Sequence, residues 1–242
     1  MKLTKIEVLR GEIKCKSGLL ICGASNGLSI GALSSEFIKN PITKEPYIPG
    51  SSLKGKLRCI LEQEQGQYGQ DGKGQKKSKS DTIPDSAPCG CGTCSICKLF
   101  GSHANGKDAI KSIPRLIVRD AELSNDSRAQ IKESDVTEEI CFETKVENVI
   151  DREKGSTRNG GMRTNERVAA GMKFDYELVL QLYDGDKDED ILTYKQLVEK
   201  GLKLIEYTYL GGCGSRGYGN VEFSKKESSD WVCVYPENKI TG

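Results

Sequence analysis

The chain has 242 residues, with 36 Lys and Arg against 35 Asp and Glu, and its formal net charge is +1. A chain of this length can bury one large core without disulfide bonds. The near-neutral charge argues against a simple basic coat for nucleic acid, so any anion site must be a local patch. Apolar runs stay far below the roughly 20 residues of a membrane helix. The N-terminal residues alternate apolar and charged side chains, so we expect a cytoplasmic protein with no membrane partner.

The first half of the chain predicts one strand, one helix and a long insertion. Alternating apolar and charged residues from Leu3 to about Cys15 are typical of a strand. After Pro49 and Gly50, apolar residues at positions 53, 57, 60 and 61 form one face of a helix, and we expect Ser51 or Ser52 to cap it. Residues 64–88 are rich in Gly, Lys, Gln and Ser without periodicity, which predicts a disordered segment.

The second half predicts three strands and a second helix. Strands are expected over residues 115–123 and 172–183, and the polar residues 150–171 look like an excursion between them. Apolar spacing from Tyr194 to Tyr209 predicts a helix that ends before Gly211 and Gly212, followed by a strand near residues 220–223. This order is typical of an α+β fold, a ferredoxin-like sheet with helices on one face.

The stretch PYIPGSSLKGKLR (residues 46–58) has the features of an anion site. A helix start exposes unpaired N–H groups, and the hydroxyls of Ser51 and Ser52 lie beside the cations Lys54, Lys56 and Arg58. We therefore expect this segment to hold phosphates. An ordinary surface helix with solvated lysines explains the same residues about equally well.

The stretch GGCGSRGYGNV (residues 211–221) contains a G-x-G-x-x-G pattern, but a helix precedes it and a strand follows, which excludes a dinucleotide site. Its backbone at Gly212 and Gly214, together with Ser215 and Arg216, can approach a phosphate closely. A turn that fixes helix-to-strand packing explains some of the glycines and leaves the arginine unexplained.

Four of the ten cysteines lie within nine residues, in the stretch CGCGTCSIC (residues 89–97). The spacing of Cys89, Cys91, Cys94 and Cys97 predicts a structural zinc site, with His103 as an alternative ligand to Cys89 or Cys91. An iron-sulfur cluster is the second possibility, although the trailing proline of bacterial ferredoxin motifs is missing. The other six cysteines are expected to be ordinary small residues.

With the segment KVENVIDR…NERVAAG (residues 145–171), these motifs resemble the RAMP-superfamily backbone subunits of type III CRISPR-Cas effector complexes, of the Csm/Cmr kind and type III-A-like. The resemblance covers nearly the whole chain. It implies a single domain over residues 1–242 with a modified RNA-recognition-motif palm, an insertion over residues 65–103 with a zinc loop, and a thumb hairpin over residues 145–171. It also implies an antiviral filament of stacked copies that binds crRNA, target RNA and other type III subunits.

The resemblance assigns guide phosphates to the helix start and to the glycine-rich loop, so that specificity is left to base pairing. It places Arg152, Arg163 and Arg167 of the thumb near RNA and makes Met162 or Val168 a wedge against the duplex. For each of these, a solvated hairpin residue is the alternative.

Two positions depart from the family pattern. Family members carry an aspartate that supports metal-dependent target cleavage where this chain has Ser34, and a serine without an adjacent base binds Mg²⁺ poorly. Leu20 stands where relatives have a histidine that contacts the guide. The sequence therefore favours a guide-binding subunit without target cleavage.

The sequence leaves three other functions to compare with this one. One is an active Mg²⁺-dependent endoribonuclease that uses Glu36, so Mg²⁺ is expected only if cleavage is retained. Another is an iron-sulfur redox protein outside nucleic-acid biology. A guide-processing nuclease is disfavoured because the chain has a single histidine, His103, beside the cysteines.

Overall fold

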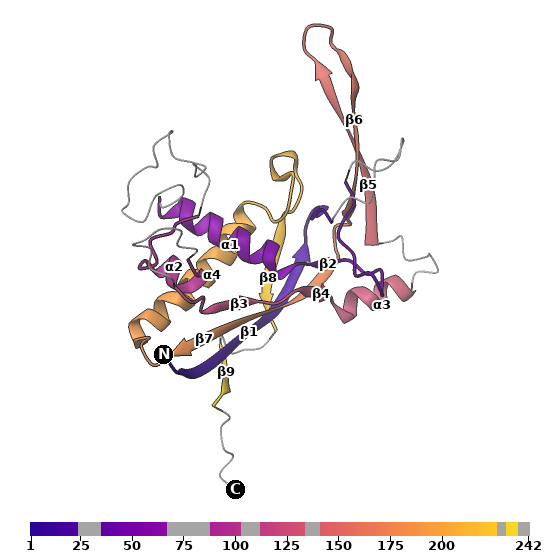
Figure 1. The fold of residues 1–242 in the computed structure, drawn as a ribbon. Helices are drawn as coiled ribbons and strands as arrows, with labels where there is room; N and C mark the ends of the chain where they lie inside the picture. The colour runs from indigo at the N-terminus through magenta and orange to yellow at the C-terminus, as the bar shows by residue number, and fades with distance from the viewer. Residues whose placement is uncertain (24–34, 67–87, 103–111, 134–140, 227–230, 237–242) are drawn as a thin grey trace.

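The computed structural model describes residues 1–23, 35–66, 88–102, 112–133, 141–226 and 231–236 (Figure 1). The helices are α1 (Gly50–Glu64), α2 (Ser95–Phe100), α3 (Asn125–Glu133) and α4 (Asp188–Tyr207), with a short 3₁₀ turn η2 (Gly214–Arg216). The strands are β1 (Leu3–Cys15), β2 (Tyr47–Ile48), β3 (Leu116–Val118), β4 (Ala121–Leu123), β5 (Phe142–Asp151), β6 (Ser156–Val168), β7 (Lys173–Tyr183), β8 (Val221–Lys225) and β9 (Val232–Tyr235).

An antiparallel sheet forms the palm. Its strand order is β2-β4-β7-β1-β8, with β3 also paired to β7 and β9 to β1. Strand β1 lies centrally and pairs along most of its length with β7, for example Leu9 opposite Leu178. With α1 between β1 and β3, and α4 between β7 and β8, the chain follows the β-α-β-β-α-β order of a ferredoxin-like fold.

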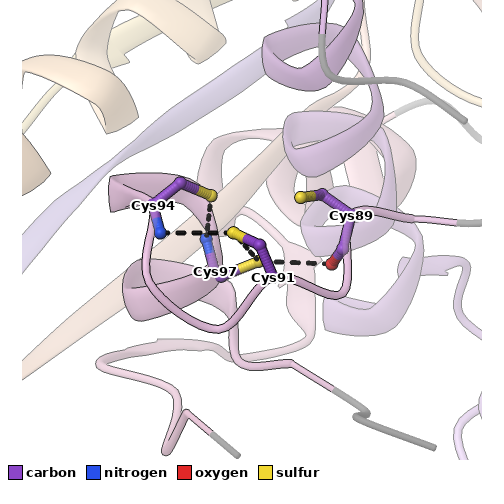
Figure 2. A group of neighbouring side chains, drawn as sticks. All are labelled: Cys89, Cys91, Cys94 and Cys97. Carbon is purple, nitrogen blue, oxygen red and sulfur yellow. Dashed lines mark hydrogen bonds between the residues drawn. The ribbon is translucent and has the colours of Figure 1, made fainter. Parts of the chain in front are cut away.

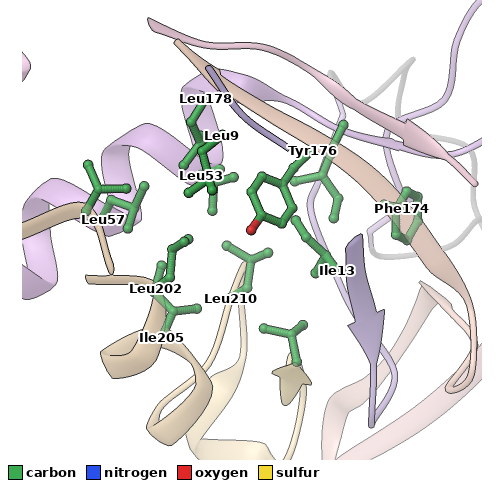
Figure 3. Close-up of a cluster of buried hydrophobic side chains, with 14 of the residues drawn as sticks. Leu9, Ile13, Leu53, Leu57, Phe174, Tyr176, Leu178, Leu202, Ile205 and Leu210 are labelled. Carbon is green, nitrogen blue, oxygen red and sulfur yellow. The ribbon is translucent and has the colours of Figure 1, made fainter. Parts of the chain in front are cut away.

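Helices α1, α2 and α4 cover one face of this sheet (Figure 1). Strand residues of one parity, such as Leu9, Ile13, Phe174 and Leu178, point toward the helices and are almost fully buried. They belong to one core with Leu53 and Leu57 of α1 and Leu202 and Ile205 of α4, and Figure 3 shows Leu9 and Leu178 beside Leu53. No helix among the described residues has the length and apolar character needed to cross a membrane.

A second, two-stranded sheet projects from the palm as a hairpin (Figure 1). Strands β5 and β6 pair antiparallel from Phe142 opposite Val168 to Asp151 opposite Ser156. At its base, Val168 exchanges backbone hydrogen bonds with Leu19 at 2.8 and 3.0 Å, which attaches the hairpin to the segment after β1. The paired strands span residues 142–168, where the sequence predicts a thumb hairpin over residues 145–171.

The main strands and helices expected from periodicity are present, but several details of the prediction were wrong. Helix α4 starts at Asp188, six residues before Tyr194, because the acidic first turn of Asp188, Glu189 and Asp190 favours a helix start without adding apolar periodicity. The predicted strand over residues 115–123 is broken into β3 and β4. Helices α2 and α3 and strand β9 were not expected.

The predicted serine cap of α1 was also wrong. The N-cap is Pro49, and no side chain caps the helix from that position. The carboxylate of Asp120, in the break between β3 and β4, instead accepts a 2.7 Å hydrogen bond from the Gly50 N–H. A Cβ atom at Gly50 would collide with the backbone of Val118 and Arg119, so only glycine allows α1 to start this close to the sheet.

Candidate nucleic-acid interface and metal centre

The start of α1 offers less to an external anion than the sequence suggested. Asp120 already places a carboxylate at the first free N–H of the helix. Ser51 is exposed and Ser52 half-buried beside it. The hydroxyls remain available to a ligand, while part of the positive end of the helix is neutralised by the protein itself.

Two of the three α1 cations face the protein. The Lys54 ammonium donates a 2.7 Å hydrogen bond to the Leu116 carbonyl. Burial and, to a smaller extent, the positive charge of Arg58 lower the pKa of Lys54. Arg58 binds Glu62 and the carbonyls of Cys89 and Gly101. It therefore contacts both ends of the segment over residues 89–101, which we call the cysteine loop.

Lys56 joins α1 to the glycine-rich loop. Its Nζ lies 3.6 Å from the centre of the Tyr209 ring, and burial lowers its pKa. The ring also lies against Gly214, where a Cβ would overlap the ring atoms. The two segments that the sequence assigned to phosphate binding therefore meet through Tyr209.

The glycine-rich loop is fixed by backbone hydrogen bonds to the segment after β1. The Gly212 N–H donates to the Leu20 carbonyl at 2.8 Å, and the Gly219 N–H to the Gly18 carbonyl at 2.9 Å. Between these anchors, Ser215 and Arg216 are exposed. Leu20 itself is buried, so its side chain is not placed to contact a guide.

Arg216 connects the glycine-rich loop to the hairpin. Its guanidinium is paired with the Glu147 carboxylate of β5, and its carbonyl accepts a 3.2 Å hydrogen bond from Lys145. An open groove of about 830 Å³ runs along this junction. Its lining residues are Lys145, Glu147, Asn148, Val149, Ile150, Arg152, Arg163 and Arg216.

The groove brings together Arg152, Arg163 and Arg216 of the predicted RNA contacts and leaves Arg167 out. Arg167 pairs with Glu143 at 2.8 Å and stacks over Tyr218, with its centre 4.6 Å from the ring centre. It lies against Gly18, where a Cβ would overlap its guanidinium. Lys145 also lines the groove, although it was not among the predicted RNA contacts. The only sequence signal for it is its position on the same hairpin face as Glu147 and Arg163.

Of the two proposed wedge residues, Val168 was wrong and Met162 remains available. Val168 is fully buried at the base of the hairpin. Met162 is 64% exposed, and Val146 and Ile150 are also more than half exposed. The alternation of side chains along β5 places Val146 and Ile150 on one open face, a pattern visible in the sequence.

Of the residues considered for cleavage, Ser34 lies outside the described part of the chain. Its neighbour Ser35 forms a parallel bridge with Asn165 of β6, and the Ser35 carbonyl accepts a 2.9 Å hydrogen bond from the Glu166 N–H. Glu36 is exposed and its carbonyl accepts a hydrogen bond from the Gly23 N–H. The segment that begins at Ser35 therefore runs beside the hairpin.

The four clustered cysteines converge at the start of α2, with Cys89, Cys91 and Cys94 before the helix and Cys97 within it (Figure 2). The sulfur atoms of Cys89, Cys91, Cys94 and Cys97 all lie within 4.8 Å of one another. Sulfurs of a tetrahedral zinc site are about 3.8 Å apart at Zn–S bonds of about 2.3 Å, so a small closure suffices. His103, the alternative ligand, lies outside the described residues.

Hydrogen bonds to sulfur favour thiolate at one of these cysteines. The N–H groups of Cys94 and Cys97 donate to the sulfurs of Cys91 and Cys94 at 3.3 and 3.4 Å. The hydrogen bond from the Cys97 thiol lowers the pKa of Cys94 to about 5, and burial raises the pKa of Cys89 to about 11. The pKa of Cys97 is raised, first by its bond to Cys94 and then by burial. Four sulfur ligands this close together, one of them favoured as a thiolate, are suited to bind a soft cation such as Zn²⁺.

Comparisons with known protein sequences all point to one family. The sequence model of the RAMP superfamily matches residues 13–222. The chain is 42% identical over 220 residues to a Methanocaldococcus jannaschii protein named CRISPR system Cms endoribonuclease Csm3, covering 89% of this chain and 77% of that one. A Methanothermobacter thermautotrophicus protein of the same name is 37% identical over 233 residues, covering 92% and 85%.

Solved structures agree with the sequences. The chain resembles one from a Csm3-Csm4 subcomplex of the type III-A CRISPR-Cas interference complex, with a TM-score of 0.52, 28% identity, and coverage of 96% of this chain and 91% of that one. Csm3 from Methanopyrus kandleri has the same fold, with a TM-score of 0.58 at 21% identity, covering 92% and 76%.

Proposed function

The chain belongs to the RAMP superfamily and is a homologue of the Csm3 backbone subunits of type III CRISPR effector complexes, and from this premise we propose that it holds the guide RNA by its phosphates. The phosphate-binding surface runs from Lys56 on α1, over the glycine-rich loop, to the groove at the hairpin. Target RNA then pairs with the guide along this surface, and base pairing supplies the specificity.

The cationic groove between the hairpin and Arg216 is the observation that carries the proposal. Arg152 and Arg163 of the hairpin and Arg216 of the glycine-rich loop converge on it, in a chain whose net charge is only +1. Phosphate contacts of this kind position a nucleic acid without reading its bases. The exposed Met162 of β6, next in sequence to Arg163, supplies apolar surface on the hairpin against a duplex.

The open face of the palm sheet is a poor alternative RNA surface. RNA-recognition motifs stack bases on aromatic residues of this face. Here the face carries ion pairs between its own strands, such as Arg10 with Glu177 at 2.7 Å and Lys226 with Asp175 at 2.7 Å. These charges neutralise one another, whereas the groove lining has four cations and only one carboxylate, so we assign the RNA to the groove.

The proposal is tested by fluorescence anisotropy with a labelled single-stranded RNA. The Arg163→Met/Arg216→Met double variant is expected to lose at least about tenfold in affinity, since each charge-assisted contact contributes about 1.5–3 kcal/mol. Arg10→Met/Arg119→Met removes the same number of charges from the open sheet face and serves as the control. Equal losses in both double variants would exclude the groove as the binding surface.

Target cleavage is a second candidate, favoured by the names of the relatives as endoribonucleases. Mg²⁺, if bound, would stabilise the charge that develops on a cleaved phosphate. Ser34 cannot supply the carboxylate that would hold the ion, and Glu36 is the nearest carboxylate in sequence. We infer that the wild-type chain does not cleave and that Ser34→Asp introduces cleavage.

The cleavage experiment uses the assembled complex with labelled complementary RNA and Mg²⁺. Evenly spaced fragments from the wild type, lost in Glu36→Gln, would establish Glu36 as the cleavage residue. Fragments from Ser34→Asp alone would support our inference.

We further propose that the cysteine cluster holds a structural zinc ion, with Cys89, Cys91, Cys94 and Cys97 as the ligands. When bound, zinc cross-links the loop and supplies folding free energy. Elemental analysis is expected to give one zinc per chain in colourless protein. Visible absorbance with iron and sulfide would instead establish an iron-sulfur cluster.

The partners follow from the same family assignment. One structural relative comes from a Csm3-Csm4 subcomplex, and another is described as a type III-B complex bound to cognate target RNA. We propose that copies of this chain stack along one crRNA together with other type III subunits, in the cytoplasm. Co-purification of an RNA of defined length with the protein tests this assembly.

A further inference from the structure

Arg58 and Glu62 lie between helix α1 and the cysteine loop. The Arg58 side chain is only 15% exposed and that of Glu62 only 1% exposed, and they pair at 2.8 Å across one turn of α1. A buried ion pair is costly unless its remaining donors and acceptors are also bonded. Here those additional bonds all go to the cysteine loop.

One guanidinium joins both ends of that loop. Arg58 donates from NH2 to the Cys89 carbonyl at 2.7 Å and from NH1 to the Gly101 carbonyl at 2.9 Å. Cys89 is the first cysteine of the cluster, and Gly101 is the residue that ends α2. Glu62 completes the arrangement by accepting the Cys89 N–H at 3.0 Å.

We propose that Arg58 and Glu62 are positioning residues for the metal loop, and that Arg58 is therefore not a contact to RNA phosphates. The planar guanidinium is suited to this task because it holds two carbonyls and a carboxylate in one fixed geometry, which a lysine ammonium does not reproduce. By fixing the backbone on both sides of the Cys89 N–H and C=O, the pair orients the Cys89 sulfur toward the other three. The inference rests on the zinc site proposed above and extends it to α1.

The test measures zinc release into a chromogenic chelator from the zinc-loaded protein. Arg58→Lys and Glu62→Gln are expected to release zinc about ten times faster or more, because losing an outer contact of a metal ligand usually lowers metal affinity about 10- to 100-fold. Glu64→Gln is the matched control, because Glu64 lies on the same helix and pairs with Lys200 at 2.6 Å without touching the loop. Release at the wild-type rate from both variants would overturn the proposal.

A second measurement separates a positioning role from an RNA contact. The Arg58→Met/Glu62→Leu double variant removes both charges together, so neither is left buried and unpaired, and folding is checked by circular dichroism. We expect faster zinc release and an unchanged salt dependence of RNA affinity. Slow, wild-type-like release with a salt slope reduced by about 0.7 would instead make Arg58 a phosphate contact.

The same experiment keeps this inference apart from the proposed function. Lys56→Met, at a position assigned to RNA, is expected to reduce the salt slope by about 0.7 and to leave zinc release unchanged. If wild-type protein does not bind RNA at all, the proposed function fails, while the zinc-release rates still decide the role of Arg58 and Glu62.

Discussion

At the scale of single residues, Glu147 controls how much positive charge the groove offers. It is paired with Arg216 and lies 3.6 Å from the Lys145 ammonium. Its carboxylate occupies the same donors that a phosphate would use. An incoming RNA strand must therefore displace Glu147 from Arg216 or share the guanidinium with it.

Replacing Glu147 with Gln is expected to strengthen RNA binding about two- to fivefold. The change removes a repulsive charge and an ion pair whose strength, at a partly exposed site, is about 0.2–1 kcal/mol. Anisotropy titrations at fixed salt measure the effect. Glu199→Gln, which removes a carboxylate paired with Lys225 outside the groove, is the control. Weaker binding by Glu147→Gln would mean that Glu147 orders Arg216 for the RNA.

The cysteine thiols make zinc binding dependent on pH. Cys89, with a pKa of about 11, and Cys97, whose pKa is also raised, are protonated at neutral pH, whereas Cys94, at about 5, is already a thiolate. Zinc takes thiolates, so binding must release the protons of Cys89 and Cys97, and affinity must rise with pH.

We expect the apparent zinc affinity to increase at least about tenfold per pH unit between pH 6 and 8. Titration calorimetry in two buffers of different ionisation enthalpy counts the released protons directly. Cys89→Ser removes one of these thiols and should lower the count. An affinity that does not change over this range would be incompatible with four cysteine ligands.

At the scale of elements, the contact between α1 and the glycine-rich loop depends on the missing side chain of Gly214. Gly214→Ala is expected to displace the Tyr209 ring, and with it Lys56, and to destabilise the fold by about 1–3 kcal/mol, as overpacking usually does. Urea unfolding measures this loss. Gly212→Ala is the control for stability, because its Cβ would lie 3.8 Å from the nearest atom, the Leu20 carbonyl oxygen. Equal midpoints for the two variants would show that the ring can move freely.

Elements with a regular apolar pattern could be predicted from the sequence, and their partners could not. The stripe of Leu53, Leu57 and Leu61 predicted α1, since helical periodicity is a local property of the chain. The role of Asp120 at the α1 start depends on a residue 70 positions away, which no pattern in residues 46–58 reveals. Helix α3 was missed because its surface is almost wholly polar and only Ser127 is buried.

The candidate sites divide in the same way. The cysteine cluster could be predicted because its ligands are close together in sequence. Which cations of α1 face away from the protein could not be predicted. Lys54 donates to the Leu116 carbonyl, and Arg58 donates to the carbonyls of Cys89 and Gly101. These carbonyls become neighbours of α1 only when the chain folds. Sequence reading thus identifies the cationic segments and leaves open which cations are free.

At the scale of the whole molecule, the described residues gather four cations, Lys145, Arg152, Arg163 and Arg216, against the single carboxylate of Glu147 where the hairpin meets the glycine-rich loop. The palm pairs its charges across its open face, and the hairpin and glycine-rich loop gather theirs around the groove. A polyanion is therefore attracted to one track and not to the whole surface.

This distribution predicts both the salt dependence and the sequence dependence of RNA binding. Contacts from Lys56, Arg152, Arg163 and Arg216 to four phosphates, at about 0.7 each for a single strand, give a slope of log K against log salt of about −3. Two RNAs of equal length and scrambled sequence should bind with affinities within about twofold, because phosphate contacts carry no base information. Titrations from 50 to 300 mM salt with both RNAs measure the two quantities. A slope near zero, or a strong preference for one sequence, would mean that base stacking and not phosphate binding holds the RNA.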